Sequence, residues 1–269
     1  MARATARPPV PNARWFVARA FDGLAPKLAL VDAVLATMVA VVLASAWRAL
    51  TGPRGSFEEL VPMLGTGLRW SVALPIAWSA LGAIADDRSS GLLDLARRRG
   101  VSSRQWLLGR AIGAGTLVAL AVGAPMITLS LVTAGFGGGA EGVLARASMV
   151  FPSIFMALAT GAVFGLGSVV VGAVASSRPM AVAVLLSLAA LGALVDLAVP
   201  GVLGVAAHQL VSPFLALEDL QGAVFDAPHM KVRGIAACAA IVAFVLSGLF
   251  VAIRTFEHER AQARAEGSA

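Results

Sequence analysis

Long apolar stretches separated by short polar breaks run through most of the chain. The hydrocarbon core of a bilayer is about 30 Å thick, so a helix needs roughly 20 apolar residues to cross it. No segment between the stretches is long enough to form a water-soluble core of its own. Six stretches reach the required length, and they predict transmembrane helices at residues 28–46, 61–85, 111–136, 149–175, 180–199 and 234–253.

The run length also favours helices over the strands of a membrane barrel. Barrel strands have about ten residues of alternating polarity, whereas the run from Ala181 to Val195 holds nothing more polar than Ser187. Hydrophobic residues make up 58% of the chain and charged residues only 13%, which is too little polar surface for a soluble globule. We therefore expect one all-α transmembrane domain covering residues 1–269.

The basic residues predict how this domain is oriented. Lys and Arg beside membrane-spanning helices are retained on the cytoplasmic side, and most of the 21 basic residues fall on the side that carries the N-terminus. Both termini are therefore expected in the cytoplasm, and the net charge of +6 is mostly a topology signal. Nucleic-acid binding is not expected, because the basic residues flank helices and form no separate basic domain.

An amphipathic segment precedes the first predicted span. Val17, Ala20, Phe21 and Leu24 are spaced to form one apolar stripe on a helix. This pattern predicts an interfacial helix over residues 13–25, lying along the inner surface of the membrane.

The polar segment 86–108, between the second and third spans, is patterned in more detail than the other breaks. Ser90 is expected to cap a short helix whose residues Leu92, Leu93 and Ala96 share an apolar face, with Arg97 and Arg98 turned away. Gly100 suits a left-handed helix stop. Ser102 and Gln105 have capping-box spacing, which predicts a second helix that continues into the third span as one rod.

This segment resembles the cytoplasmic loop of type-2 ABC transporter permeases, the six-span subunits of many bacterial exporters. The likeness lies in two acidic residues, the Gly91-Leu92-Leu93 run, a basic turn with Val-Ser, and a Leu-Leu-Gly-Arg sequence that ends at Arg110. The family pattern has Thr, Pro and Lys where this chain has Leu92, Gly100 and Arg110. The segment Ser212-Pro213-Phe214, which leads toward Gly222 and Asp226, is similar to a second stretch of that family.

The resemblance implies a permease of the bacterial inner (plasma) membrane, paired with a second copy or a paralogue. It also implies a separate ABC ATPase subunit that contacts the short helix, called a coupling helix in that family. The residues that we expect to couple to this partner are Asp87, Gly91, Leu92, Leu93, Arg97, Arg98 and Arg99. Charge reversal at Arg97 and Arg98 is predicted to abolish coupling and to leave membrane insertion intact.

The chain has no nucleotide-binding loop of its own. A Walker A motif needs Gly-x-x-x-x-Gly-Lys followed by Ser or Thr, but the two lysines, Lys27 and Lys231, follow Pro and Met. ATP and magnesium are therefore expected on the partner subunit, and the chain is not expected to be an enzyme. No metal or cofactor is expected either, because the three histidines show no ligand spacing.

Arg69 is a candidate for the substrate pathway. If the second span starts near Val61, Arg69 lies about two turns inside it, where a charge costs about 2.5–3.5 kcal/mol unless it is paired or faces water. If the helix starts at Trp70 instead, Arg69 is merely interfacial. The pairs Gly109/Gly113 and Gly161/Gly165 have the spacing that lets helices approach closely, and packing within the chain is expected for them.

Two other classes of function remain open. A secondary transporter would need half-helices or acidic residues near the midplane, and no clear inverted repeat is visible. A membrane scaffold without transport activity would explain the hydrophobicity but not the patterned loop. The sequence does not indicate a substrate, and lipid, drug and peptide export all remain possible.

Overall fold

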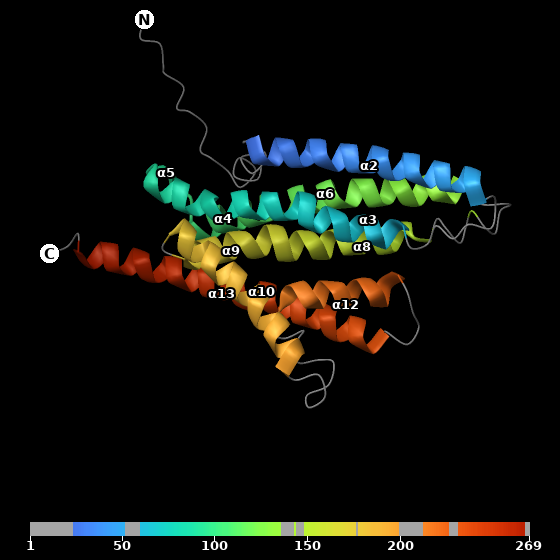
Figure 1. The fold of residues 1–269 in the computed structure, drawn as a ribbon. Helices are drawn as coiled ribbons and strands as arrows, with labels where there is room; N and C mark the ends of the chain where they lie inside the picture. Colours follow the sequence, from blue (N-terminus) through green and yellow to red (C-terminus); the bar gives the residue numbers. More distant parts are fainter. Residues whose placement is uncertain are drawn as a thin grey trace, which may run out of the picture.

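Helices account for every secondary-structure element in the described part of the chain, and most of them lie side by side in one bundle (Figure 1). The structure is a computed structural model that describes residues 24–51, 60–135, 143, 148–175, 177–198, 212–225 and 231–266. The helices are α2 (Leu24–Thr51), α3 (Leu60–Leu68), α4 (Leu74–Ser89), α5 (Leu92–Arg98), α6 (Ser103–Gly135), α8 (Val150–Thr160), α9 (Gly167–Val174), α10 (Arg178–Ala198), α12 (Pro213–Phe225) and α13 (Lys231–Glu266).

Two π-helical segments join some of these helices into longer rods. Segment η2 (Arg69–Ala73) connects α3 to α4, and η3 (Gly161–Leu166) connects α8 to α9. A π-helix is rare and appears mostly as a single wide turn inside an α-helix, often at a functional site. Residues 60–89 and 150–174 therefore each form one rod with a wide turn in it.

Five of the described helices are long and apolar enough to cross a membrane, which confirms an all-α, multi-pass membrane protein. They are Pro26–Leu50, Leu60–Ser89, Ser103–Gly135, Val150–Val174 and Gly234–His258. These ranges match five of the predicted spans to within a few residues at most ends, although the third begins eight residues earlier than expected because α6 includes part of the polar segment. Large apolar side chains on α2, such as Val42 and Leu43, are mostly exposed, as expected for a surface that faces lipid.

Two predicted elements stay predictions. The span 180–199 corresponds to α10, but the apolar stretch found there, Arg178–Leu188, is shorter than the other candidate spans. Of the interfacial helix predicted over residues 13–25, residues 13–23 lie outside the described part of the chain. Leu24 and Ala25 begin α2.

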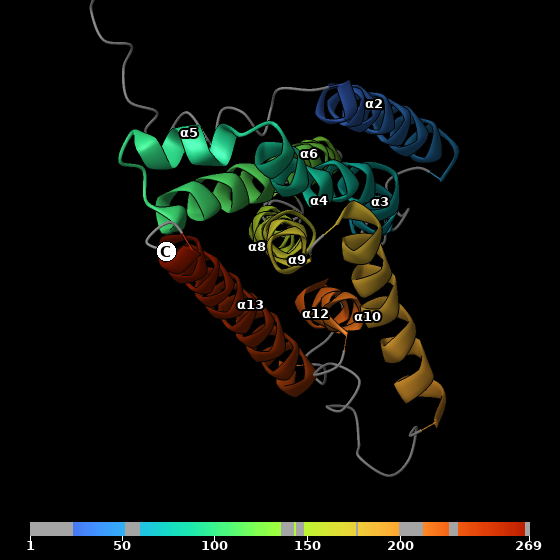
Figure 2. The same ribbon diagram turned by 90° about the vertical axis from the view of Figure 1, so that its left-hand side faces the viewer.

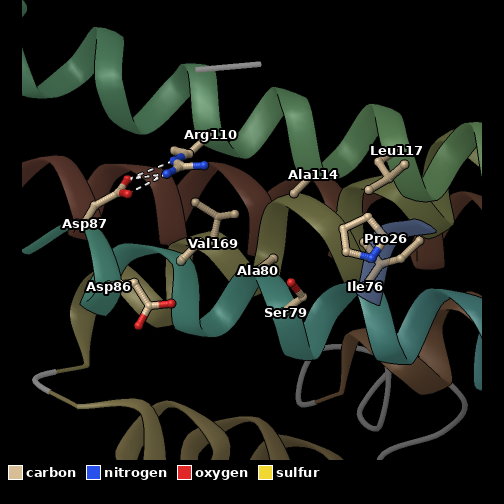
Figure 3. Close-up of a pocket in the computed structure, with 11 residues that line it drawn as sticks. Pro26, Ile76, Ser79, Ala80, Asp86, Asp87, Arg110, Ala114, Leu117 and Val169 are labelled. Carbon is tan, nitrogen blue, oxygen red and sulfur yellow. Dashed lines mark hydrogen bonds and ion pairs between the residues drawn. The ribbon is translucent and has the colours of Figure 1, made fainter. Parts of the chain in front are cut away.

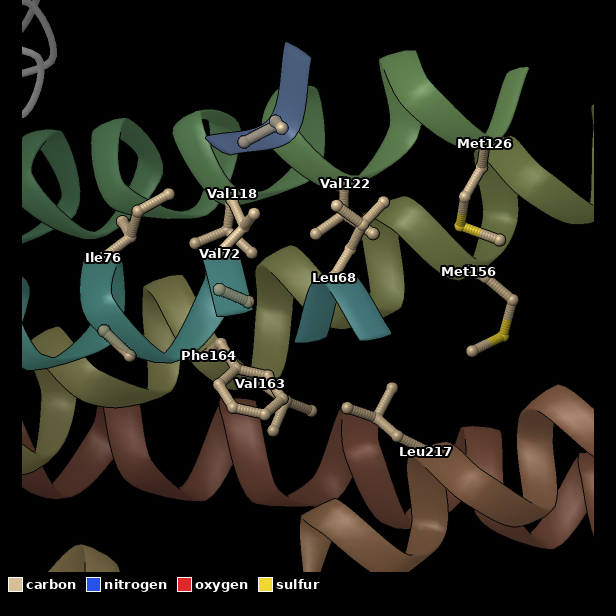
Figure 4. Packing of buried hydrophobic residues seen from close by; sticks show 14 of the residues in the cluster. Leu68, Val72, Ile76, Val118, Val122, Met126, Met156, Val163, Phe164 and Leu217 are labelled. Carbon is tan, nitrogen blue, oxygen red and sulfur yellow. The ribbon is translucent and has the colours of Figure 1, made fainter. Parts of the chain in front are cut away.

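The core forms around α6, which packs against α2, α3, α8 and η3 (Figure 4). At the crossing of α6 and η3, glycines bring the two backbones together. A Cβ atom on Gly165 would lie 2.5 Å from the carbonyl oxygen of Ala114 and 2.5 Å from the Cα atom of Gly115. The Gly161/Gly165 pair therefore packs within the chain, as the sequence predicts.

Helix α12 was not expected from the hydrophobic pattern. It occupies part of the predicted loop between the last two spans and packs along α13 and α8 (Figure 1). Ser212 precedes it, with the backbone N–H of Leu215 3.5 Å from the Ser212 hydroxyl, and Pro213 is its first residue. Ser at the N-cap and Pro at the first helical position are a recognised helix start, so the sequence did contain a signal for this helix.

Candidate functional site

The patterned segment 86–108 forms a helical hairpin at one end of the bundle, which we call the hairpin. It consists of the last turn of α4, the short helix α5 and the first turns of α6. The N-terminal end of α2 and the C-terminal end of α13 lie at the same end of the bundle (Figures 1 and 2). The sequence therefore predicted a short helix here correctly, and its role remains to be inferred from its surroundings.

Glycines make both turns of the hairpin. Gly91 has φ 69° and Gly100 has φ 84°, in the left-handed region that favours glycine. After α5, the N–H of Gly100 donates to Arg97 O at 3.0 Å and the N–H of Val101 donates to Ala96 O at 3.0 Å. This is the hydrogen-bond pattern of a Schellman helix end, so the predicted stop at Gly100 is confirmed.

The predicted cap at Ser90 is wrong. Gly91 occupies the N-cap position of α5, where no side-chain cap forms. The Ser90 hydroxyl instead donates to the carbonyl oxygen of Asp87 at 3.5 Å, which belongs to the end of α4. The reason is the left-handed turn at Gly91, which places Ser90 in the preceding helix end and away from the first turn of α5.

The capping box at the start of α6 is confirmed. The N–H of Gln105 donates to the Ser102 hydroxyl at 3.2 Å, and the N–H of Ser102 donates to the Gln105 side-chain oxygen at 3.2 Å. From Ser103 onward α6 continues without interruption to Gly135. The second helix of segment 86–108 and the third predicted span are therefore one rod, as the sequence predicts.

A buried ion pair closes the base of the hairpin (Figure 3). Arg110 on α6 donates from Nε to Asp87 Oδ2 at 2.9 Å and from Nη2 to Oδ1 at 2.5 Å and Oδ2 at 2.6 Å. The two side chains are only 6% and 4% exposed. Asp87, predicted as a residue that couples to a partner, is thus directed into the bundle, where it fixes α4 to α6.

Helix α5 has a buried apolar face and an exposed polar face, as the sequence predicts, except that Arg97 is half-buried. Leu93 and Ala96 are buried and Leu92 is half-buried, so this side faces the protein. Arg97 is half-buried and lies 3.5 Å from Asp94, with its Nε and Nη2 atoms buried. The exposed residues are Asp94, Leu95, Arg98 and Arg99, so the outer face combines two basic groups with one acidic group and one large apolar side chain.

The hairpin rests on the end of α13. Trp106 on α6 and Phe256 on α13 are both buried and form an edge-to-face contact with ring centroids 5.4 Å apart. The guanidinium carbon of Arg88 lies 4.9 Å from the centre of the Phe256 ring, and its nitrogens donate to the carbonyl oxygens of Ala173 and Ala175 at the end of α9. Helices α4, α6, α9 and α13 therefore meet at the base of the hairpin.

A cleft of about 220 Å³ lies beside the buried ion pair (Figure 3). Pro26 of α2, Ser79 and Asp86 of α4, and Arg110 of α6 line it together with apolar side chains. No group of His, Cys, Asp or Glu side chains that could hold a metal ion occurs among the described residues.

Arg69 occupies a second polar site, toward the other end of the bundle. The second apolar helix begins at Leu60, so Arg69 lies inside it, about 13 Å from its start. Arg69 is 5% exposed and donates to the Thr66 hydroxyl at 3.2 Å. Gln221 of α12 donates to the same hydroxyl at 3.0 Å, and Glu218 of α12 is close enough to act on the charge of Arg69.

Three residues of these sites were not predicted as such, because their contact partners lie far away in the sequence. Arg110 was quoted as a motif residue but not as the partner of Asp87, and neither Phe256 nor Gln221 was singled out. Their contacts span 23 to 155 residues of sequence, so local spacing gave no signal for them. Comparison with protein-family models, with curated proteins and with solved structures found no match to this chain.

Proposed function

We propose that this protein is the membrane-spanning permease subunit of an ATP-driven ABC transporter. Its resemblance to the permeases of bacterial exporters favours export as the direction of transport. The hairpin is the observation that supports this proposal best. It holds a short helix at one end of the bundle, with its inner face packed on the membrane helices and its outer face, including Leu95, Arg98 and Arg99, open to a partner. ATP hydrolysis takes place on a separate ATPase subunit that docks there.

The proposal includes six spans with both termini in the cytoplasm. The start of α2 and the end of α13 lie at the same end of the bundle (Figure 1), which requires an even number of crossings. Five long apolar helices leave one crossing to be made. Helix α10 has 21 residues and a length of about 31 Å. It leaves the hairpin end of the bundle obliquely, and α12 ends at the far end (Figures 1 and 2), so we assign the remaining crossing to the segment that begins with α10. The excess of basic residues at this end supports a cytoplasmic position for the hairpin.

Arg69 is proposed as a residue of the substrate pathway. A charge inside an apolar helix is costly unless it is paired or faces water, and such residues often mark transport paths. Its neighbours Thr66 and Gln221 are polar, and Gln221 belongs to α12, which lies beside α13. The full transporter contains a second permease, identical or paralogous, with the path between the two copies.

The test is to look for a gene for a lone ABC ATPase beside the gene of this protein, to reconstitute the two proteins in lipid nanodiscs, and to measure ATP hydrolysis with and without the permease. We expect the ATPase to bind and its activity to change. The double variant Arg98→Glu and Arg99→Glu is expected to lose this effect while inserting normally, because it reverses the charge of the exposed face of α5. Arg48→Glu, at the far end of α2, is the matched control for a change of charge.

The proposal is contradicted if the wild-type protein neither binds the ATPase nor changes its rate of ATP hydrolysis. It is also contradicted if the Arg98/Arg99 variant changes that rate as much as the wild-type protein does. Transport driven by an ion gradient without ATP would instead favour a secondary transporter.

A further inference from the structure

The last apolar turn of α13 carries contacts that the proposed function has not used. Phe256 is 1% exposed and packs against Trp106 of the hairpin. The next residue, Glu257, accepts hydrogen bonds from Arg104 Nε at 3.0 Å and Nη2 at 2.6 Å. One aromatic contact and one ion pair, made by successive residues of α13, thus join this helix to the first turn of α6. The two partners of the ion pair are 153 residues apart in the sequence.

The first turns of α6 lie between these contacts and α5 (Figure 2). Leu93 and Ala96, the buried residues of α5, belong to the same hydrophobic cluster as Trp106, Phe256 and Ala252. A helix of seven residues is too short to be stable by itself, so its position is set by what its apolar face packs against. Removing the Phe256 ring therefore loosens the cluster to which the apolar face of α5 belongs.

Helix α13 is connected to the Arg69 site through α12. It packs along α12 for much of that helix, and Gln221 of α12 donates to Pro62 O at 3.0 Å and to the Thr66 hydroxyl beside Arg69. The hairpin is consequently connected to the Arg69 site in two ways: along the rod α3–η2–α4, and through α13 and α12.

We infer that the end of α13 is a positioning element for the hairpin: Phe256 and Glu257 hold α5 in its docking position and carry its displacement to α13 and α12. Phe256 acts through packing, because its ring is buried between Trp106 and Arg88. Glu257 orients the end of α13 relative to α6 through its ion pair with Arg104. This pair adds little stability, because its side chains are 42% and 64% accessible. The transport part of this inference rests on the proposed function.

The first test needs no partner. Hydrogen exchange is measured by mass spectrometry on the purified protein in nanodiscs, comparing wild type with Phe256→Ala. We expect amide exchange in residues 92–106 to rise about tenfold or more, because α5 loses packing support, while the membrane part of α6 stays protected. Phe250→Ala is the matched control. It makes the same truncation on α13 at a ring that is 60% exposed, so exchange in residues 92–106 stays near wild type.

The second test uses the complete transporter and measures substrate moved per ATP hydrolysed. Glu257→Arg alone is expected to lower this ratio, and adding Arg104→Glu is expected to restore it, because the exchanged pair recreates the ion pair. A purely structural role would change the amount of folded transporter and leave this ratio at the wild-type value. Arg254→Gln changes a cation on the exposed side of α13, away from the hairpin, and is expected to leave the ratio unchanged.

The two proposals fail in different ways. If the wild-type protein neither binds nor affects an ATPase, the proposed function is wrong, and the exchange experiment still decides whether α13 positions the hairpin. If Phe256→Ala leaves both hairpin exchange and transport per ATP at wild-type values while the Arg98/Arg99 variant is inactive, the inference about α13 is wrong and the proposed function survives.

Discussion

Asp87→Ala is expected to destabilise the protein strongly, because it leaves the guanidinium of Arg110 buried without a counter-charge. The Arg110 side chain is 6% exposed, and Asp87 accepts all three of the hydrogen bonds that join the pair. Breaking a buried ion pair by removing one partner typically costs about 3–5 kcal/mol. At about 1.4 kcal/mol per tenfold change, this corresponds to a shift of two to almost four orders of magnitude in the unfolding equilibrium.

The measurement is reversible unfolding in mixed detergent micelles, with a double-mutant cycle of Asp87→Ala, Arg110→Ala and both together. We expect the double variant to lose less stability than the sum of the single variants, since it leaves no unpaired charge. Replacing the pair by Asp87→Leu with Arg110→Met should come close to wild-type stability, because apolar side chains remove the cost of desolvating two ions.

The control is Asp94→Ala on the outer face of α5. The Asp94 side chain is 70% exposed and its ion pair with Arg97 is long, so its removal should cost at most about 1 kcal/mol. If Asp87→Ala and Asp94→Ala destabilise equally, or if the cycle shows no coupling between Asp87 and Arg110, then the pair is not shielded from water and the reasoning fails.

Two further predictions concern the bundle itself. Gly165→Ala should destabilise the protein by about 1–3 kcal/mol in the same unfolding assay, because the added Cβ would collide with backbone atoms of α6. Gly67→Ala is the control and should be neutral or slightly stabilising, because there is open space around Gly67. Equal effects of the two substitutions would contradict the close crossing of α6 and η3. Arg69→Ala should reduce transport while Arg69→Lys retains part of it, measured as substrate flux in proteoliposomes, and unchanged flux in the alanine variant would remove Arg69 from the pathway.

The sequence was most informative where neighbouring residues determine the structure. Apolar run length predicted the five confirmed membrane-length helices, because crossing a bilayer imposes a fixed length. Gly100 and the pair Ser102 and Gln105 predicted their helix ends, because these signals act over three residues. Ser90 misled because a serine before a short helix and a serine at the end of the previous helix look alike in sequence.

The contacts that define the candidate site could not be predicted in the same way. The partners of Asp87 and Trp106 depend on how α4, α6 and α13 are rotated about their axes, and nearly uniform apolar stretches carry little information about rotation. Arg69 was identified by its charge alone, but its neighbour Gln221 comes from α12, a helix that the hydrophobic pattern hid within a loop.

The wide turn at η2 fixes how the two parts of its rod are rotated relative to each other. A π-helical turn holds one residue more than an α-helical turn needs, and one residue corresponds to about 100° around an α-helix. Deleting Val72 would therefore let the rod become regular, with α4 and the hairpin unchanged and α3 turned by about 100°. Thr66 would then point away from α12, so a single inserted residue decides which side of this span meets Gln221.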